Sequence, residues 1–267
     1  MKFVFDHDLH IHSKLSLCSG DPEQTPENIL RYAEENGLHT ICLTDHMWDE
    51  NVPGFTDCGA YSVQNFAYIS QSRPLPQSKN VRFLFGCETE MDRFLTVPVS
   101  KARFDEFDFI VVPTTHMHFL GFTISQEDGA TAKTRAKAWV KRLDALLNKD
   151  LPFHKVGVAH LTCGLIARPR EVFLDVMQSI PSEDMQRLFK KAACLGVGIE
   201  LNAANMGYAD AEADVVLRPY RIAKECKCKF YCGSDAHSLK DFEAVKNFAR
   251  AIDALGLEES DKFLLRK

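Results

Sequence analysis

The amino-acid sequence predicts an α/β fold in which seven strands form a barrel. Short apolar runs alternate with segments of helical pattern along the chain, and this alternation is typical of a mainly parallel sheet. The apolar runs lead to polar residues, so we expect a functional site at the C-terminal ends of the strands. Candidate site residues follow six of the seven strands, whereas an open doubly wound sheet would gather them only at its switch point. The pattern therefore favours a closed ring of strands.

The composition is that of an ordinary globular protein and predicts one domain. The chain has 267 residues, of which 45% are hydrophobic and 26% are charged. This length suffices for a full core, and no repeat, low-complexity tract or linker divides it, so we expect residues 1–267 to form a single domain. The net charge of −5 argues against non-specific binding to nucleic acid, which needs clustered Lys and Arg side chains.

The sequence also predicts a cytoplasmic protein that is not embedded in a membrane. No signal-peptide pattern follows Met1, and no apolar run approaches the ~20 residues of a membrane span. The nine cysteines are scattered, and several lie inside apolar runs, as in Ile41-Cys42-Leu43. This distribution is typical of reduced thiols rather than of a disulfide framework.

The first third of the chain predicts two strands, one helix and a long loop. We expect a strand at residues 8–11, followed by a helix in which Thr25 is the N-cap and Pro26 takes the first helical position. Residues 40–43 form the second strand. Residues 52–80 contain Pro, Gly, Ser and Gln with weak periodicity, so we expect a loop there, with room for one short helix, that forms a wall of the site.

The remaining elements continue the alternation. Apolar runs predict five further strands, at residues 81–85, 107–112, 156–159, 197–201 and 229–232. Helical periodicity predicts four more helices, at residues 131–148, 170–178, 183–195 and 241–255. Gly196 and Gly256 are placed to end the last two of these helices.

The pair His10 and His12 is the most informative feature of the chain. On an extended segment the two imidazoles point to the same side, because strand side chains alternate with a period of two. A second motif, Asp235-Ala236-His237, lies near the other end of the chain. Imidazole and carboxylate together suit divalent transition metals, whose ligands usually come from distant parts of a chain. The two motifs therefore predict a metal site.

Other polar residues at the ends of apolar runs complete this candidate site. They are His46, Glu88, His116 and His160. Glu90 competes with Glu88, and His118 with His116, because each lies two residues further along and would point the same way. We prefer His116, which is nearer the end of its strand.

Together these motifs resemble the PHP (polymerase and histidinol phosphatase) domain family. The matching residues follow the family's order over nearly the whole chain: Asp8-Leu9-His10-Ile11-His12, Thr44-Asp45-His46, Gly86-Cys87-Glu88, His116, Ala159-His160 and Gly233-Ser234-Asp235-Ala236-His237. The resemblance implies a distorted seven-stranded (β/α)7 barrel and a cluster of two or three divalent metal ions that hydrolyses phosphoesters. It also favours Glu88 over Glu90, because Glu88 follows Gly86 as in the family pattern.

The resemblance further implies a ligand set for each metal ion. One ion would be held by His10, His12, Glu88 and Asp235. A second would be held by Glu88, His116 and His160, with Glu88 as the bridge, and His46 and His237 would contribute to a third. Ligands of these types suit zinc, manganese or iron.

The chain departs from the family pattern at Cys18. Phosphatases of the family often have a histidine at this position, six residues after His12. A thiolate can bind zinc, so Cys18 could complete the third site. Cys18 could equally be a packed thiol, which would leave that site weak or empty.

The candidate residues suggest how hydrolysis would proceed. A divalent metal lowers the pKa of a bound water to about 7, so a metal-bound hydroxide would be available at neutral pH. We assign catalytic roles to Glu88, Asp235 and His237. Asp8 and Asp45 could orient imidazole N–H groups, although Asp8 also fits a turn cap.

Three residues are candidates for binding the substrate. Arg168 and Arg170 could clamp a phosphate, and Asn202 could line the pocket. Each has a simpler alternative. The two arginines could be solvated at the start of a helix, and the Asn202 amide could form hydrogen bonds within its own loop.

The sequence therefore predicts a metal-dependent phosphoric ester hydrolase. We expect its substrate to be a small-metabolite phosphomonoester, and the resemblance makes histidinol phosphate a candidate. A phosphodiesterase or exonuclease is the alternative enzyme, against which the net charge weighs. The non-enzymatic alternative is a metal-binding module that has lost its activity. The departure from the family pattern at Cys18 is the reason to retain it.

Overall fold

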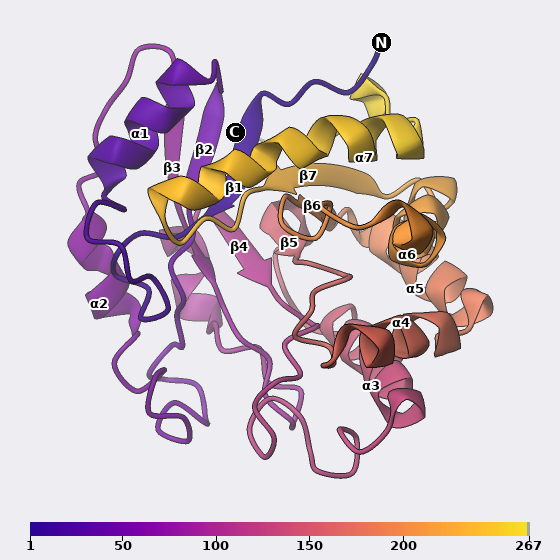
Figure 1. The fold of residues 1–267 in the computed structure, drawn as a ribbon. Coiled ribbons are helices and arrows are strands. Elements are labelled where there is room, and N and C mark those ends of the chain that lie inside the picture. The colour runs from indigo at the N-terminus through magenta and orange to yellow at the C-terminus, as the bar shows by residue number, and fades with distance from the viewer. Residues whose placement is uncertain (266–267) are drawn as a thin grey trace.

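A computed structural model describes residues 1–265, and within them seven parallel strands pair in chain order (Figure 1). The strands are β1 (His7–Ile11), β2 (Thr40–Leu43), β3 (Arg82–Glu88), β4 (Phe109–Val112), β5 (Val156–Val158), β6 (Gly198–Asn202) and β7 (Lys229–Gly233). The segment after β7 returns to β1, where the Asp235 N–H donates to His10 O at 2.7 Å and the His12 N–H donates to Ala236 O at 3.0 Å. These bonds nearly close the ring, so the predicted (β/α)7 barrel is confirmed.

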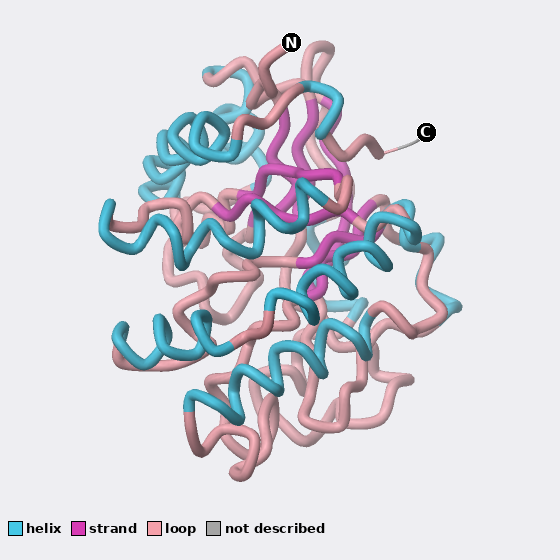
Figure 2. Tube along the Cα trace, turned by 90° about the vertical axis from the view of Figure 1, so that its right-hand side faces the viewer, coloured by secondary structure: helices cyan, strands magenta, loops and turns pink. Residues whose placement is uncertain are grey.

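Helices surround this ring on the outside, as Figure 2 shows. The α-helices are α1 (Pro26–Glu35), α2 (Phe66–Ile69), α3 (Ala132–Leu146), α4 (Arg170–Ser179), α5 (Ser182–Leu195), α6 (Ala213–Glu225) and α7 (Asn247–Leu255). In Figure 1, α1 and α2 cover one side of the barrel, and α3 to α6 cover the other. No helix within residues 1–265 is both long and apolar enough to cross a membrane.

Local signals explain several of these boundaries. Thr25 caps α1 by accepting a hydrogen bond from the Asn28 N–H, and Pro26 takes the first position of the helix, as predicted. Gly196 and Gly256 follow α5 and α7 with φ values of 74° and 59°, which a glycine adopts without strain. The predicted loop at 52–80 contains α2 and a short 3-10 turn.

The structure differs from the sequence-based prediction at two helices. Helix α6 was not predicted, because Pro219 inside it is a strong helix-breaking signal. It forms because one face of the helix packs into the core, where Leu217 and Tyr220 are fully buried. The last predicted helix, 241–255, is irregular at its start, where a 3-10 segment covers Leu239–Lys246.

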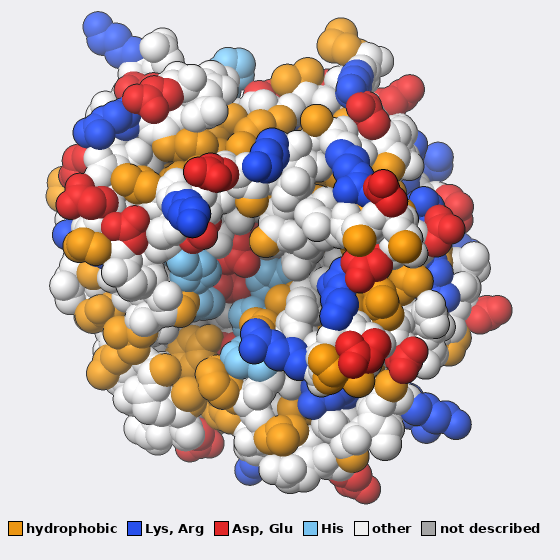
Figure 3. Space-filling model, viewed as in Figure 1, with side chains coloured by type: hydrophobic (Ala, Val, Ile, Leu, Met, Phe, Trp, Pro, Cys, Tyr) orange, Lys and Arg blue, Asp and Glu red, His pale blue; other side chains and the backbone are white. Residues whose placement is uncertain are grey.

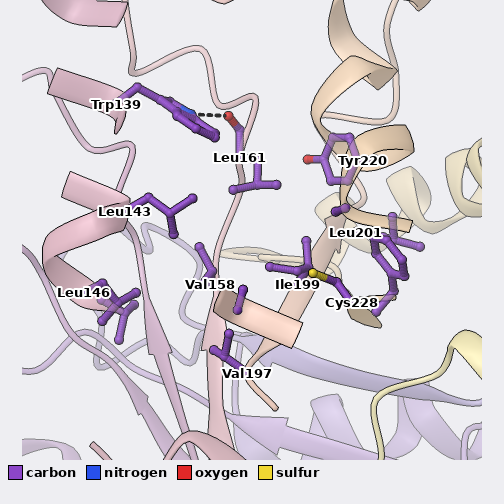
Figure 4. Packing of buried hydrophobic residues seen from close by; sticks show 14 of the residues in the cluster. Trp139, Leu143, Leu146, Val158, Leu161, Val197, Ile199, Leu201, Tyr220 and Cys228 are labelled. Atoms are coloured by element: carbon purple, nitrogen blue, oxygen red, sulfur yellow. Dashed lines mark hydrogen bonds between the residues drawn. The ribbon is translucent and has the colours of Figure 1, made fainter. Parts of the chain in front are cut away.

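The main core lies between the strands and the helices of one side (Figure 4). Trp139 and Leu143 of α3 pack against the side of the barrel formed by β5 and β6. The indole N–H of Trp139 donates to Leu161 O at 3.1 Å. Inside the ring a separate apolar cluster fills the barrel, and Phe263 is part of it. The polar site is therefore confined to the opposite end, where the strands finish.

A buried arginine fixes the loops at that end. Arg142 of α3 is 2% exposed, and its guanidinium donates hydrogen bonds to backbone carbonyls of four residues. The acceptors are Met91, Asp92, Thr114 and Thr123, at 2.6 to 3.2 Å. Burial lowers the pKa of Arg142 to about 10, so the side chain stays charged at neutral pH. Arg142 thereby holds the segments after β3 and β4 in place, because a planar fork of N–H donors satisfies several buried carbonyls at once.

Candidate metal centre

The strands deliver the candidate ligands to one hollow at their C-terminal ends. Figure 3 shows histidine and acidic side chains together at the bottom of a depression in the molecular surface. His10 lies on β1 and His12 directly after it, while Glu88 ends β3. The loops that follow β2, β4, β5 and β7 bring in His46, His116, His160, Asp235 and His237. All eight predicted imidazole and carboxylate ligands are brought together in the hollow.

Glu88 lies at the centre of this cluster. Its Oε2 atom is 3.3 Å from both His10 Nε2 and His12 Nε2, and 3.0 Å from His46 Nδ1. Its Oε1 atom faces the other side, 3.2 Å from His160 Nε2 and 4.0 Å from His116 Nε2. The two oxygens of one carboxylate therefore face two different sets of histidines.

Asp235 faces the same histidines from the opposite wall. Its Oδ1 atom lies 3.3 Å from His12 Nε2 and 3.5 Å from His10 Nε2, and its Oδ2 atom lies 3.8 Å from His160 Nε2. The Asn202 amide donates to Asp235 Oδ2 at 3.2 Å. Asn202 thus contacts a candidate ligand, and a role for it in substrate binding stays a prediction.

The donor atoms form four compact groups. Three of them contain the residues that the family resemblance assigns to each ion, namely His10 with His12, Glu88 and Asp235; Glu88 with His116 and His160; and His12 with His46 and His237. The fourth group joins His10 and His160 to Glu200, a residue not predicted for the site. Ligation by these groups stays a prediction, and its tests are given below.

The protonation of the two histidines on the first motif fits a cation between them. His10 Nδ1 faces a Glu200 oxygen at 2.6 Å, and His12 Nδ1 faces Ser16 Oγ at 2.9 Å. The Glu200 carboxylate can only accept, so His10 Nδ1 is the donor in the first contact. Ser16 donates its own proton to Asp45, so His12 Nδ1 is the donor in the second. In the neutral form of each ring, the Nε2 atom would then carry a lone pair, yet the two Nε2 atoms lie 3.0 Å apart. Two lone pairs at this distance repel each other unless a proton or metal ion lies near both.

Two orphaned atoms in the same place support this interpretation. Glu88 Oε1 and His46 Nδ1 are buried and form no hydrogen bond with the described residues. A buried polar atom without a partner costs about 1–3 kcal/mol, so native structures rarely tolerate two in one site. Divalent cations would satisfy both atoms. The residues present therefore fit the metal cluster that the resemblance implies.

A second layer of polar groups orients the imidazoles. Glu90 Oε2 accepts from His116 Nδ1 at 2.9 Å and from the Tyr61 hydroxyl at 3.1 Å. Glu90 is therefore a partner of His116. Together with Glu200 it supplies the carboxylate–histidine pairs that typically surround a metal site. Both glutamates are fully buried. In the sequence, the position of Glu200 between Ile199 and Leu201 in an apolar run was the signal that could have revealed one of them, although it does not indicate the partner.

The structure distinguishes between the roles suggested for Asp8 and Asp45. Asp8 Oδ1 accepts the backbone N–H groups of His10 and Ser234, so this side chain ties β1 to the end of β7. Asp45 reaches His12 only through the Ser16 hydroxyl, which it accepts at 2.7 Å. Asp8 therefore takes the turn-capping role that its short side chain also suits.

Electrostatics keep the carboxylates of the cluster ionised. Burial raises the pKa of Glu88, but the neighbouring charges of His46 and His10 outweigh it and hold the pKa well below its usual range. Burial likewise opposes charge on His12, yet hydrogen bonds to Asp235 and Glu88 raise its pKa to about 9. The carboxylates thus attract positive charge to the centre, and protons and metal ions compete for the same donor atoms.

Cys18 lies in the hollow but outside the four donor groups found among the described residues. Cys18 is exposed to solvent, but desolvation by the surrounding walls, together with the charges of Glu88 and Asp235, raises the pKa of its thiol to about 12. The geometry places this thiol on the wall of the hollow, and a role for Cys18 as ligand stays a prediction.

The two predicted arginines are not part of the hollow. Arg170 forms a bidentate pair with Glu212, at 3.0 and 2.6 Å, and its guanidinium covers the Phe173 ring. Arg168 is exposed. Burial lowers the pKa of His118 to about 4, and the charges of His116 and Arg168 act in the same direction, so Arg168 lies within electrostatic reach of the mouth.

The cluster forms the floor of a cavity of about 260 Å³. The walls come from Leu17 and Cys18 after β1, from Tyr61 and Gln64 in the long loop, and from Phe119 after β4. The predicted position of residues 52–80 as a wall of the site agrees with the contribution of Tyr61 and Gln64.

Comparisons with known proteins agree with the fold and the motifs. A sequence model of the PHP domain matches residues 8–204. Among curated protein sequences, none matches this chain. The structure is similar to the crystal structure of histidinol phosphate phosphatase from Lactococcus lactis subsp. lactis Il1403, complexed with zinc, L-histidinol and phosphate. The TM-score is 0.58 and the identity 14%, over 97% of this chain and 98% of that chain.

A second solved structure gives a weaker match. It is the cryo-EM structure of an archaeal ribonuclease P with mature tRNA, with 12% identity over 92% of this chain and 90% of that chain. Its TM-score of 0.39 is too low to carry an argument. The first match, at 14% identity, supports the barrel fold and leaves the substrate to be argued from the site itself.

Proposed function

Because this chain belongs to the PHP domain family, we propose that it is a metal-dependent phosphoesterase that hydrolyses a small phosphomonoester. The observation that carries the proposal is the position of Glu88, whose two carboxylate oxygens face two different sets of histidines. A shared carboxylate is the arrangement that holds two cations at the short spacing used in two-metal hydrolysis. The orphaned atoms Glu88 Oε1 and His46 Nδ1 support the same proposal.

The proposed ligand sets follow the donor groups. His10, His12, Glu88 and Asp235 would hold one ion, and Glu88, His116 and His160 a second. His46 and His237 would contribute to a third, together with His12. When bound, such cations acidify water and neutralise the charge of the phosphate oxygens.

The chain's own residues position the reactants. Glu88 and Asp235 balance the positive charge of the site, while Glu90 and Glu200 fix the orientation of the imidazoles. In the reaction, the oxygen of water forms a bond to phosphorus and the ester P–O bond breaks. The proton of the water ends on the leaving alcohol, so the products are an alcohol and inorganic phosphate. The walls of the cavity restrict the size of that alcohol.

A combined metal and substrate screen tests this proposal. The purified protein is analysed for zinc, manganese and iron, and is then assayed with phosphomonoesters, including histidinol phosphate, and with phosphodiesters. We expect at least two metal ions per chain and release of inorganic phosphate from monoesters. Cleavage of diesters alone would favour the phosphodiesterase alternative, and metal binding without any hydrolysis would favour a binding module.

A further inference from the structure

The cavity above the cluster has a different chemical character from its floor. The floor consists of the candidate ligands, whereas the walls above it are mainly apolar. They carry the side chains of Leu17, Ala60, Tyr61, Phe119 and Leu165, beside the more polar Cys18, Gln64, His118 and Cys163. Leu17 is 52% exposed and Phe119 is 47% exposed, so both present apolar surface at the rim. Exposed apolar side chains that gather around a concave site are typical of a surface that contacts a ligand.

No lysine or arginine side chain lines this cavity within the described part of the chain. Arg170 is engaged by Glu212, and Arg168 stays outside the walls. Once the reacting phosphate occupies the metal cluster, a second anionic group on the substrate, such as a carboxylate or another phosphate, would lose hydration against these walls without a lysine or arginine among the lining residues. Such a loss strongly disfavours binding.

The acidic side chains of the cavity are equally unsuited to a second cationic group. Glu88 and Asp235 face the histidines of the cluster. Glu90 uses both oxygens, because Oε1 accepts the Met91 N–H at 2.8 Å and Oε2 accepts from His116 and Tyr61. An ammonium group on the leaving alcohol, such as that of histidinol, therefore has no free carboxylate among these residues.

A neighbouring depression does not change this conclusion. It lies on the other side of Asp235 and His237 and carries Lys240 and Lys246, but it also carries Asp241 and Glu243. With Asp235 counted, two lysines face three carboxylates, so the depression carries no net positive charge. Of the candidate ligands only Asp235 and His237 line it, whereas six line the main cavity. The reacting phosphate is accordingly placed in the main cavity, with its leaving group against the apolar walls.

We propose that the substrate is a compact phosphomonoester whose leaving alcohol is uncharged and largely apolar, with room for about one ring. This inference rests on the proposed phosphoesterase function and narrows its substrate class. A volume of about 260 Å³ lies just below the range of ~300–1,000 Å³ for pockets that take drug-sized ligands. The proposal excludes nucleotides, sugar bisphosphates and nucleic acid as preferred substrates.

Three esters with nearly equal leaving-group chemistry test the proposal. They are benzyl phosphate, para-carboxybenzyl phosphate and para-(aminomethyl)benzyl phosphate, whose charges lie too far from the ester oxygen to change its reactivity much. For the metal-loaded protein we expect kcat/KM to be at least ~10-fold higher for benzyl phosphate than for either charged ester. Equal or better hydrolysis of a charged ester would overturn the proposal while leaving the phosphoesterase function intact.

A substitution in the cavity wall tests whether the preference for an uncharged ester arises in this cavity. Leu17→Lys places an ammonium group at the rim, so we expect it to raise the ratio of carboxybenzyl to benzyl hydrolysis by about 10-fold. The matched control is Leu264→Lys, because Leu264 is exposed among the residues at the N-terminal ends of the strands. An unchanged ratio in Leu17→Lys, or an equal change in the control, would contradict the proposal.

A binding measurement separates the failure of this inference from the failure of the proposed function. Benzylphosphonate and para-carboxybenzylphosphonate have no ester bond, so calorimetry on the metal-loaded protein measures binding alone. Tighter binding of benzylphosphonate supports the apolar subsite even if no ester is hydrolysed, in which case only the phosphoesterase function fails. Equal or weaker binding of benzylphosphonate overturns the subsite whatever the turnover.

Discussion

Glu200 accepts a 2.6 Å hydrogen bond from Nδ1 of His10, which lies 190 positions earlier in the chain. The other oxygen of Glu200 accepts the backbone N–H of His160 at 2.7 Å. His160 has a φ of 32°, in the left-handed region that non-glycine residues seldom adopt, so this bond helps to hold a strained backbone. A Cβ atom at position 233 would collide with Glu200 Oε1, which explains the glycine there. One carboxylate on β6 therefore positions two candidate ligands, one on β1 and one in the loop after β5.

The first prediction concerns this positioning residue. Glu200→Gln removes the negative charge that makes His10 more basic, and its amide can present an acceptor to only one of the two N–H donors. We expect metal affinity to fall by about 10–100-fold, the range typical of partners that orient a metal-bound histidine. Titration of the metal-free protein with zinc measures this change.

The control for this variant is Glu225→Gln, which removes a charge from an exposed position at the end of α6. It should leave the affinity for zinc within about two-fold of the wild type. If Glu200→Gln bound zinc as tightly as the control, the bond to His10 would have a purely structural role.

The second prediction concerns Glu88 itself. Glu88→Gln keeps the volume of the side chain but removes the charge that faces two sets of histidines. Two cations would then repel each other with less compensation, so we expect metal to be lost and activity to fall by at least ~100-fold. Elemental analysis and phosphate release check this outcome, and full metal content with near-normal turnover would show that Glu88 is not the bridge.

The third prediction concerns two residues at opposite ends of the chain. His10 Nε2 lies 3.5 Å from Asp235 Oδ1, and the two belong to one donor group. His10→Ala and Asp235→Ala should therefore remove the same ion, and their effects on activity should be strongly non-additive. Steady-state rates for both single variants and the double variant provide the measurement. A double variant that showed the product of two independent losses would disprove the shared ion.

The barrel and the residues at the strand ends were predictable because their signals are local. A strand repeats with a period of two, and His10 and His12 show that period directly in the sequence. Glu88 follows an apolar run and ends β3, where the sequence places it. These residues needed only their neighbours in the chain to be recognised.

The partners of these ligands were not predictable in the same way. The role of Glu200 depends on the distant residues His10 and His160, and nothing near position 200 indicates either. From the sequence, Arg142 would be expected on the exposed face of an amphipathic helix. In the structure it is buried and holds the loops of the site. Helix α6 was not predicted because Pro219 indicates a helix break, whereas the packing of the buried face that stabilises the helix is not visible in the sequence. Each of these features depends on contacts between segments that are far apart in sequence.

The fourth prediction concerns stability at low pH, away from the site. Asp6 accepts hydrogen bonds from His7 Nδ1 and from Lys262 Nζ, each at 2.9 Å. Burial raises the pKa of Asp6, but these bonds outweigh it and lower the pKa from 3.8 to about 2. A lowered pKa in the folded state adds stability above pH 4, and this stability is lost as the pH falls towards 2. The contribution at neutral pH is at most about 2 kcal/mol.

Urea unfolding of the wild type and Asp6→Asn tests this contribution. The asparagine variant should be less stable at pH 7, and the difference between the two proteins should shrink steadily below pH 4. Other acidic groups titrate in both proteins, so their effects cancel in the comparison. A difference in the free energy of unfolding that stayed constant from pH 7 to pH 3 would contradict the assignment.

The last prediction concerns Cys18, where the chain departs from the family pattern. The thiol lines the cavity but lies outside the donor groups, and the third group is formed by His12, His46 and His237 without it. We therefore expect Cys18→Ser to keep the metal content and to change turnover by less than about three-fold, because it alters the wall and not the ligands. Elemental analysis and phosphate release measure both quantities in parallel. If instead the metal content fell by about one ion in Cys18→Ser and returned in Cys18→His, the thiolate would be a ligand of the third site. The rate at which Cys18 reacts with thiol reagents distinguishes the two cases independently. Added zinc should slow this reaction if the thiolate is coordinated, and should leave the rate unchanged if the thiol only lines the wall.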